Sequence, residues 1–458
     1  MADEADRHVE PGWVQHAVFW QVYPLGFVGA EPQNPRYSDP VGSTTIHHRL
    51  PAIAAWLDRA VELGSSGLLL GPVFESESHG YDTVDYFRVD PRLGDRDDLI
   101  ALFTAAHDRG LRVLLDGVFN HVGRRFPQFA AVVEHGPGAP EEEWFQVSWP
   151  AGAGAGQEPR YDDFEGHGQL VTLNHDSPAV ADLVVDVMCH WLDAGADGWR
   201  LDAAYAVPLS FWADVSGRVR ERHPDAYLVG EVIHGDYPSF VTEGGLDSVT
   251  QYELWKAVRN SIVEKNLYEL AWSLKRHAEF LQTFAPLTFL GNHDVTRIAS
   301  AVPAEHLGHA VALLCCLGGT PTVYYGDELG WEAVKEDRFG GDDAIRPAFG
   351  DPGGALSERE SLVLDLHREL IGFRRRHAWL HRASTTTPSL DNEYAVFLTA
   401  HDGQWIALAL NLSAAEQELP VPGAVEVMAG AGRLAEAGSD AAAITLEPHG
   451  WAVVGPAA

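Results

Sequence analysis

Eight short apolar runs, rich in β-branched and aromatic residues, alternate along the chain with longer amphipathic stretches. These runs span residues 18–24, 67–73, 112–119, 198–204, 227–233, 246–252, 286–292 and 320–326. Near-continuous apolar strands that alternate with helices are typical of a parallel sheet covered by helices. Eight such units in one chain predict a closed (β/α)₈ barrel. A doubly wound open sheet is the alternative, but the sequence lacks the glycine-rich GxGxxG loop that usually accompanies it.

Two regions depart from this rhythm. More than 50 residues separate the third run from the next helical segment, which predicts a functional insertion on the carboxyl side of the third strand. After about residue 380, short strand-like runs separated by turn residues predict an antiparallel β-sandwich. The expected division is an N-terminal arm (1–15), a barrel (16–120 and 173–378), an inserted domain (121–172) and a C-terminal β domain (379–458).

Two intervals carry clear signals for helices that wrap the barrel. In 177–195, Ser177 stands at the N-cap, Pro178 at the first helical position and Gly195 after the end. The interval 96–110 likewise ends in a glycine. We expect both helices to turn an apolar stripe inward.

The charge excludes some partners. The formal net charge is −34, which argues against binding to nucleic acid and to anionic membrane surfaces, because both need basic residues. The acidic N-terminus does not resemble a signal peptide, and no apolar run approaches the length of a membrane span. Three scattered cysteines form no disulfide framework or zinc motif. We therefore expect a cytoplasmic enzyme acting on a neutral substrate.

Polar side chains gather at the carboxyl ends of the predicted strands. Five of the runs end in or lead into them: His79, Tyr81 and Asp82; Asp116, Asn120 and His121; Arg200 and Asp202; Glu231; and Asn292, His293 and Asp294. Any one aspartate there can be a turn or helix cap. Helix capping does not require carboxylates at several strand ends, however, and in a barrel these ends converge on one cleft. The set therefore predicts an active site.

The motifs DGVFNH (116–121), GWRLDAA (198–204), GEV (230–232) and FLGNHD (289–294) occur in the order typical of one enzyme family. Together with LVTLNHDSP (170–178), HGYDTVDYFRVDPRLG (79–94) and TPTVYYGDELG (320–330), they resemble the α-amylase family of glycoside hydrolases, family 13. The resemblance covers about residues 16–375 and implies a TIM barrel. It also implies a retaining α-glycosidase that hydrolyses α-glucosidic bonds, mainly α-1,4, of maltooligosaccharides through a covalent glycosyl-enzyme intermediate.

The resemblance assigns the catalytic roles. Asp202 is the expected nucleophile, Glu231 the acid/base and Asp294 the carboxylate that stabilises the transition state. Substrate contacts are expected from Tyr81, Asp82, His121, Arg200, His293 and Arg297, with Asp116 and Asn120 supporting the site from behind.

The charges near the two catalytic carboxylates predict different protonation states. Arg200, on the same strand face as Asp202, is expected to keep that carboxylate ionised and aimed. Glu231 is expected to lack a cation and so to hold a proton, because no lysine or arginine lies in 227–237.

The sequence also departs from the family pattern. Ala203–Ala206 lacks the Lys-His pair that follows the nucleophile in many calcium-dependent α-amylases, so a catalytic calcium ion is not supported and no cofactor or site metal is expected. A calcium ion held by a carboxylate-rich loop elsewhere stays open. The segment 123–147 resembles the short insertion of cyclomaltodextrinases, neopullulanases and maltogenic amylases. Only about 15 residues precede the barrel, so the N-terminal dimerisation domain of that group, and an obligate protein partner, are not expected.

Several alternatives stay open at this point. Within the family they are an α-glucan transglycosylase, which shares the same intermediate, and a disaccharide-specific α-glucosidase or isomerase. Outside it they are a non-catalytic carbohydrate-binding barrel and a metal-dependent hydrolase, although no HxH or HExxH spacing occurs. The insertion aromatics Trp144, Phe145 and Trp149 either contact substrate or pack between domains.

Overall fold

An eight-stranded parallel sheet forms the centre of the computed structural model, which describes residues 10–38, 45–338 and 340–457. Its strands are β1 (Phe19–Val22), β2 (Gly67–Leu70), β5 (Arg112–Gly117), β11 (Gly198–Leu201), β12 (Tyr227–Gly230), β13 (Ser248–Val249), β14 (Leu287–Phe289) and β15 (Thr320–Tyr324). Each of the eight predicted runs contains one of these strands, so the barrel prediction is confirmed.

The order of the strands closes the sheet into a barrel. They lie in the order β13-β12-β11-β5-β2-β1-β15-β14, so every strand neighbours its predecessor in the sequence of barrel strands. A parallel bridge between Thr250, next to β13, and Leu287 of β14 joins the two ends. Closure brings all carboxyl ends to one mouth, which is where barrel active sites form.

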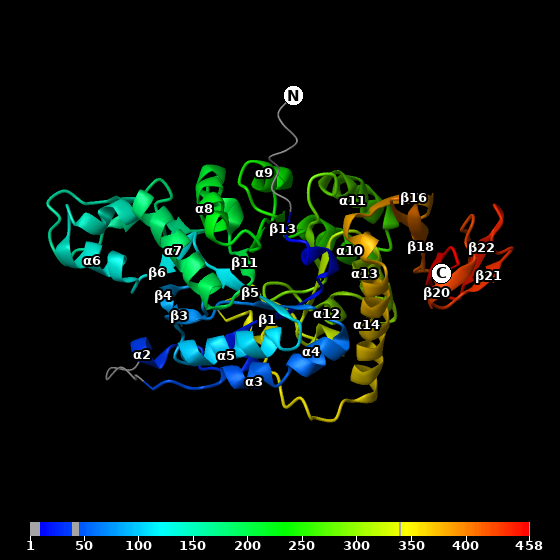
Figure 1. The fold of residues 1–458 in the computed structure, drawn as a ribbon, viewed down its shortest axis with the longest axis horizontal. Coiled ribbons are helices and arrows are strands. Elements are labelled where there is room, and N and C mark those ends of the chain that lie inside the picture. Colours follow the sequence, from blue (N-terminus) through cyan, green and yellow to red (C-terminus); the bar gives the residue numbers. More distant parts are fainter. Residues whose placement is uncertain (1–9, 39–44, 339, 458) are drawn as a thin grey trace.

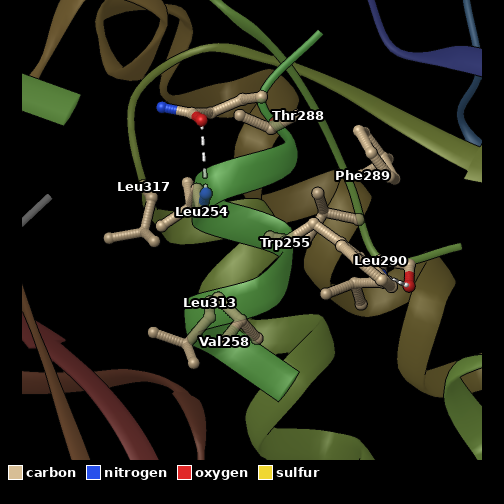
Figure 2. A pocket seen from close by; sticks show the side chains of 10 residues that line it. Leu254, Trp255, Val258, Thr288, Phe289, Leu290, Leu313 and Leu317 are labelled. Carbon is tan, nitrogen blue, oxygen red and sulfur yellow. Dashed lines mark hydrogen bonds between the residues drawn. The ribbon is translucent and has the colours of Figure 1, made fainter. Parts of the chain in front are cut away.

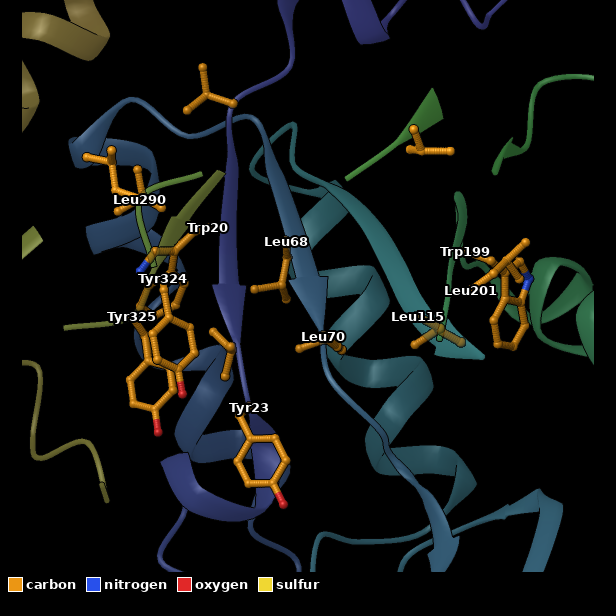
Figure 3. Close-up of a cluster of buried hydrophobic side chains, with 14 of the residues drawn as sticks. Trp20, Tyr23, Leu68, Leu70, Leu115, Trp199, Leu201, Leu290, Tyr324 and Tyr325 are labelled. Carbon is orange, nitrogen blue, oxygen red and sulfur yellow. The ribbon is translucent and has the colours of Figure 1, made fainter. Parts of the chain in front are cut away.

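Alternate residues of the strands face opposite sides of the barrel wall. Trp20, Leu68, Leu115, Trp199 and Leu201 belong to the large core cluster shared with the surrounding helices (Figure 3). The intervening positions form a second cluster inside the barrel, which Val14 and Ala17 of the N-terminal segment join: Phe19, Leu69, Leu114, Tyr227, Val229 and Leu287. Arg200 stands between the outward-facing Trp199 and Leu201, so its side chain points inward.

The helices that cover the barrel surround its strands in Figure 1. They are α1 (Pro24–Phe27), α2 (Pro35–Ser38), α3 (Leu50–Ala54), α4 (Leu57–Leu63), α5 (Arg96–His107), α7 (Pro178–Ala194), α8 (Leu209–Arg222), α9 (Tyr237–Thr242), α10 (Tyr252–Val263), α11 (Leu267–Phe280), α12 (Ile298–Ala301), α13 (Leu307–Cys316) and α14 (Glu358–Arg376). A hairpin of β3 (Phe74–Ser76) and β4 (Thr83–Val89) follows β2.

The predicted ends of helices α7 and α5 are confirmed in part. Helix α7 begins at Pro178 and ends before Gly195, whose left-handed φ of 120° suits glycine. Ser177 occupies its N-cap, but the hydroxyl makes no capping bond. Helix α5 ends at His107, three residues before the expected Gly110. Its unpredicted start is a capping box in which Asp95 and Asp98 each bond the other's backbone N–H.

Between β5 and α7 the chain forms a small separate layer, drawn at one end of the molecule in Figure 1. It contains β6 (His121–Gly123), α6 (Pro127–His135), η3 (Pro140–Trp144), β7 (Val147–Ser148), β8 (Arg160–Tyr161), β9 (Asp163–Phe164) and β10 (His167–Thr172). Strands β6, β10 and β9 make one sheet, and β7 pairs with β8. Phe145 is buried, while Trp144 and Trp149 are half-buried against the main core. Packing therefore accounts for these three aromatics.

At the opposite end, antiparallel strands follow α14. One sheet has the order β16 (Ser384–Leu390), β17 (Tyr394–His401), β18 (Gln404–Asn411), β23 (Trp451–Gly455) and β20 (Glu426–Gly430); the other has β19 (Gln417–Pro420), β22 (Ala443–Leu446) and β21 (Arg433–Ala435). Phe397 and Leu408 pack into the main core, and Val396 and Ala409 into a second cluster with Leu419. The first sheet is thus buried on both faces.

The domain boundaries expected after residues 15, 120, 172 and 378 stay predictions. The change of element type near each of the last three supports it. Residues 1–9 of the expected N-terminal arm lie outside the described residues.

Candidate active site

The centre of the candidate site is the guanidinium of Arg200, on β11. The sheet register sets Arg200 beside Asp116 of β5 and Val229 of β12, and Glu231 lies two residues beyond Val229 on the same face. Nη1 donates to both carboxylate oxygens of Asp116 at 2.8 Å and to Oδ1 of Asp202 at 3.0 Å. Nη2 lies 2.7 Å from Oε1 of Glu231. One cation therefore holds three carboxylates from three neighbouring strand ends.

This arrangement corrects one expectation. Glu231 was expected to lack a cation, but it forms an ion pair with Arg200. The pairing follows from strand register, because β11 and β12 are neighbours and Arg200 pairs with Val229, two residues before Glu231. The sequence around Glu231 holds no sign of this ion pair, because its cation lies on another strand.

Glu231 is also fixed by two further donors. Tyr252 Oη donates to Oε1 at 3.0 Å, and the backbone N–H of Ala203 donates to Oε2 at 3.0 Å. Ala203 has a left-handed φ of 46°, which residues with a side chain rarely adopt. That backbone conformation accompanies the N–H contact to the carboxylate, and unusual conformations of this kind cluster at functional sites.

The electrostatics of Asp202 differ from the simple expectation that Arg200 keeps it ionised. Burial, and after it the charge of Glu231, raise the pKa of Asp202 well above its usual value, while Arg200 lowers it. One guanidinium therefore serves both carboxylates, with Nη1 contacting Asp202 and Nη2 contacting Glu231.

Asp294 stands in the opposite electrostatic environment. Burial alone would favour its neutral form, but His293, Arg346 and Arg200 hold the pKa of Asp294 well below its ordinary value. Its carboxylate lies 2.9 Å from Nε2 of His293 and accepts from Nη2 of Arg346 at 3.0 Å. The backbone N–H of Asp294 donates to Oδ1 of Asn292 at 2.8 Å. Asp294 is therefore a fixed negative charge.

Two histidines and a tyrosine complete the inner wall. Tyr81 and His293 stack at a centroid distance of 5.4 Å, and Tyr81 Oη contacts His293 Nε2. Asn120 Nδ2 donates to His121 Nδ1 at 3.1 Å, which leaves the proton of a neutral imidazole on Nε2. Burial, and then His79, lower the pKa of His121 to about 3, so the ring is neutral at physiological pH. Nε2 is buried and has no hydrogen-bond partner among the described residues.

These groups surround one cavity of about 440 Å³, within the size range of small-molecule sites. Five predicted site residues line it: Tyr81, His121, Asp202, Glu231 and Asp294. Asp116, Asn120, Arg200 and His293 lie behind this wall and hold its members through the contacts above. The convergence expected of a barrel mouth is therefore observed for nine predicted residues.

Two predicted substrate contacts lie elsewhere. Asp82 accepts from the backbone N–H and the hydroxyl of Ser78, so it organises its own loop. Arg297 is buried and donates to Asp327 Oδ1 at 2.8 Å and to the carbonyl oxygens of Tyr325 and Ile345. Both side chains are engaged by the protein and neither lines the cavity, so a direct substrate contact is not supported for them.

His79, named above among the side chains at strand ends, also lines the cavity. The other lining residues include several that the sequence analysis did not assign to the site: Phe164, Glu165, Tyr205, Tyr252, Lys335, Asp342 and Arg346. Tyr252 ends the sixth predicted run, and its position at a strand end could have identified it. Arg346 lies in the long connection after β15, and Glu165 at a hairpin tip. Their sequence surroundings carry no comparable signal.

Two other features of the described residues do not form part of this site. Among them, one group of His48, Asp95 and Asp98 has the spacing of metal ligands, but both aspartates already cap α5. Figure 2 shows a second cavity, behind β14, lined by Leu254, Trp255, Leu290 and Leu313 among other residues. Its volume is about 10 Å³, at the lower limit for one water molecule, and its apolar walls mark a packing void.

Comparison with known proteins identifies similar sequences and a matching family model. The model of the alpha amylase catalytic domain matches residues 21–395. The chain is 29% identical over 474 residues to a cyclomaltodextrinase of Geobacillus thermopakistaniensis, covering 97% of this chain and 78% of that protein. It is 30% identical over 351 residues to an intracellular maltogenic amylase of Bacillus subtilis, covering 73% of this chain but only 58% of the relative.

The fold has solved counterparts of similar length. Cyclic alpha-maltosyl-(1-->6)-maltose hydrolase from Arthrobacter globiformis superposes with a TM-score of 0.80 at 27% identity, over 98% of this chain and all of that one. No helix in the described parts of the chain is long and apolar enough to cross a membrane. On the match of the family model to most of its length, the chain belongs to the α-amylase family of glycoside hydrolases.

Proposed function

We propose that this chain is a retaining α-glycosidase that hydrolyses α-1,4-glucosidic bonds of maltooligosaccharides and related α-glucans. The observation that carries the proposal is the group of buried carboxylates around Arg200, two of which, Asp202 and Glu231, line one cavity together with Asp294. The similar proteins are a cyclomaltodextrinase and a maltogenic amylase, and their names favour α-glucans as the substrate class.

The first half of the reaction forms the covalent intermediate. An ionised oxygen of Asp202 attacks the anomeric carbon, and the bond between that carbon and the glycosidic oxygen breaks. Glu231 donates its proton to the departing oxygen, so the leaving sugar departs as a neutral alcohol. The step therefore begins with Asp202 ionised and Glu231 protonated, because these are the states that a nucleophile and a general acid require.

The second half releases the product. Glu231, now ionised, takes a proton from a water molecule as the oxygen of that water attacks the anomeric carbon. The bond to Asp202 breaks and leaves Asp202 ionised, and the proton taken from water is on Glu231. Two displacements at one carbon give net retention of the α configuration.

Other residues of the wall have proposed binding roles. His121 Nε2 and the fixed carboxylate of Asp294 are placed to bond sugar hydroxyls, since both line the cavity. The face of Tyr81, held against His293, offers a stacking surface for the sugar whose anomeric carbon reacts. A negative charge at Asp294 also favours the positive charge that develops on that sugar in the transition state.

Removing each carboxyl group in turn, with azide as a rescuing nucleophile, tests these roles. Glu231→Gln should lower kcat on maltotriose by about 10²–10⁴-fold, the usual contribution of a general acid. With Asp202→Ala, azide should attack the substrate directly and yield a β-glycosyl azide. With Glu231→Ala, azide should attack the intermediate and yield an α-glycosyl azide. Turnover close to wild type in folded Asp202→Ala and Glu231→Ala would contradict the mechanism.

The similar A. globiformis enzyme is named a hydrolase, which favours hydrolysis over glycosyl transfer as the main outcome. Product analysis on maltotriose separates the two: hydrolysis yields only glucose and maltose, and transfer yields longer oligosaccharides. The word intracellular in the name of the B. subtilis relative supports a cytoplasmic location, which activity measurements on separated cell fractions and medium would test.

A further inference from the structure

Two segments far apart in the sequence meet at one wall of the catalytic cavity. Phe164 and Glu165 belong to the hairpin between β9 and β10, and Tyr205 lies in η4 (Ala204–Ala206), just after β11. All three line the cavity. Tyr205 Oη donates to Glu165 Oε1 at 2.7 Å. This hydrogen bond ties the inserted layer to the loop that follows Asp202.

The local structure of the hairpin gives its tip a defined position. Glu165 and Gly166 both have left-handed φ values, 54° and 84°, as in the tight two-residue turns that match the twist of antiparallel strands. Gly166 N–H donates to Asp163 Oδ1 at 2.9 Å. The ring of Phe164 stacks on His121 at a centroid distance of 4.7 Å and an interplanar angle of 17°. The tip is thereby anchored to the wall of the site.

The position of Tyr205 relative to Glu231 identifies the part of the substrate that this wall faces. The backbone N–H of Tyr205 donates to the carbonyl oxygen of Glu231 at 3.3 Å. An acid that protonates the glycosidic oxygen must lie within hydrogen-bond reach of it. The sugar that leaves with that oxygen therefore lies beside Glu231, and Tyr205 is next to it.

The chemistry of the three side chains suits a sugar ring. The rings of Phe164 and Tyr205 stand 6.5 Å apart at 52° and offer apolar faces to the C–H groups of a sugar. The Glu165 carboxylate and the phenol oxygen of Tyr205, whose proton is engaged by Glu165, offer acceptors to sugar hydroxyls.

We propose that Phe164, Glu165 and Tyr205 form a leaving-group clamp that binds the sugar ring expelled in the first step. This deepens the proposed function and rests on it. Glu165 has two tasks in the clamp: it positions the Tyr205 ring through their hydrogen bond, and it accepts from a sugar hydroxyl. The same ring site would receive the acceptor sugar in glycosyl transfer, because transfer is the reverse of leaving-group expulsion.

A pair of donors with and without a leaving sugar tests the clamp. Maltotriose and α-maltosyl fluoride deliver the same maltosyl unit to Asp202, but only maltotriose expels a sugar. Glu165→Ala should lower kcat/KM on maltotriose by about tenfold, mainly through KM, the loss expected for one hydrogen bond to a charged group. Its kcat/KM on α-maltosyl fluoride should change much less. Glu165→Gln keeps an oxygen acceptor for Tyr205 and should restore most of the maltotriose activity.

Two further variants sharpen the test. Tyr205→Phe removes the hydroxyl alone, and its effect should not add to that of Glu165→Ala, because both changes break one hydrogen bond. Gln169→Ala alters an exposed position on the same hairpin, outside the residues that line the cavity, and serves as the matched control.

The outcomes separate this proposal from the proposed function. Equal losses on both donors in Glu165→Ala, or activities indistinguishable from Gln169→Ala, would overturn the clamp while wild-type hydrolysis still supports the proposed function. Failure of the wild-type chain to cleave either donor would overturn the proposed function itself.

Discussion

Arg200 has the densest set of contacts in the site, since its guanidinium serves three carboxylates at once. Nη1 donates to both oxygens of Asp116 and to one oxygen of Asp202, and Nη2 contacts Glu231. A single positive charge cannot neutralise three negative ones. The site therefore stores electrostatic repulsion, which catalysis uses and which the folded state must tolerate.

This repulsion predicts that removing the Asp202 charge stabilises the protein. The pKa of Asp202 is raised in the folded state, so its ionised form costs stability at neutral pH. Asp202→Asn should raise the free energy of unfolding at pH 7 by about 0.5–2 kcal/mol, measured by urea denaturation. The gain should shrink as the pH falls from the raised pKa of the folded state toward the ordinary value of an unfolded aspartate.

Asp294→Asn is the matched control with the opposite sign. The pKa of Asp294 is lowered, so its charge contributes stability at all pH values above its unfolded pKa. That variant should be less stable than wild type at pH 7. If Asp202→Asn were destabilised to the same degree, repulsion within the carboxylate group would not be the cause.

Among the elements, the turn after β15 shows how a site is supported from behind. Strand β15 leads into η6 (Asp327–Leu329), where Asp327 binds Arg297 and Glu328 Oε2 accepts from the N–H of Gly326. Burial raises the pKa of Asp327 to about 6, and burial together with the charge of Asp327 raises the pKa of Glu328 to about 7. This turn is therefore a source of pH-dependent stability.

Glu328→Gln should remove part of that dependence. In the folded chain Glu328 binds its proton near pH 7, against about 4.5 when unfolded, so lowering the pH through this window stabilises the wild type. The variant should be more stable than wild type at pH 8, by about 1–3 kcal/mol, and the difference should vanish below about pH 4.5. Denaturation at a series of pH values measures it.

Glu332→Gln, at an exposed position four residues away, is the control for this measurement. A Glu328→Gln variant that follows the wild-type curve across the whole pH range would show that Glu328 does not titrate near neutrality.

For the molecule as a whole, the alternation of strands and helices was enough to predict the barrel, because each buried strand is a local apolar run. Closure of the barrel then places Asp202, Glu231 and Asp294 in one cavity, as their strand ends required. The change from a barrel to antiparallel sheets was also predicted by the short strand-like runs after residue 380.

What the sequence could not predict depends on register and on long connections. The contact between Arg200 and Glu231 is set by the offset of β11 against β12. Arg346 reaches Asp294 from a connection more than 50 residues further along the chain. The sequence could not show that Asp82 and Arg297 bond Ser78 and Asp327 and lie outside the cavity lining. Each of these outcomes needs three-dimensional distances.

Trapping the covalent intermediate tests the central claim most directly. A 5-fluoro-α-glucosyl fluoride slows breakdown of a glycosyl-enzyme more than its formation, so the adduct accumulates and can be located by mass spectrometry of proteolytic peptides. The account predicts one glucosyl adduct, on Asp202, absent from Asp202→Asn. An adduct on another carboxylate, or steady hydrolysis of glucans by Asp202→Asn, would contradict it.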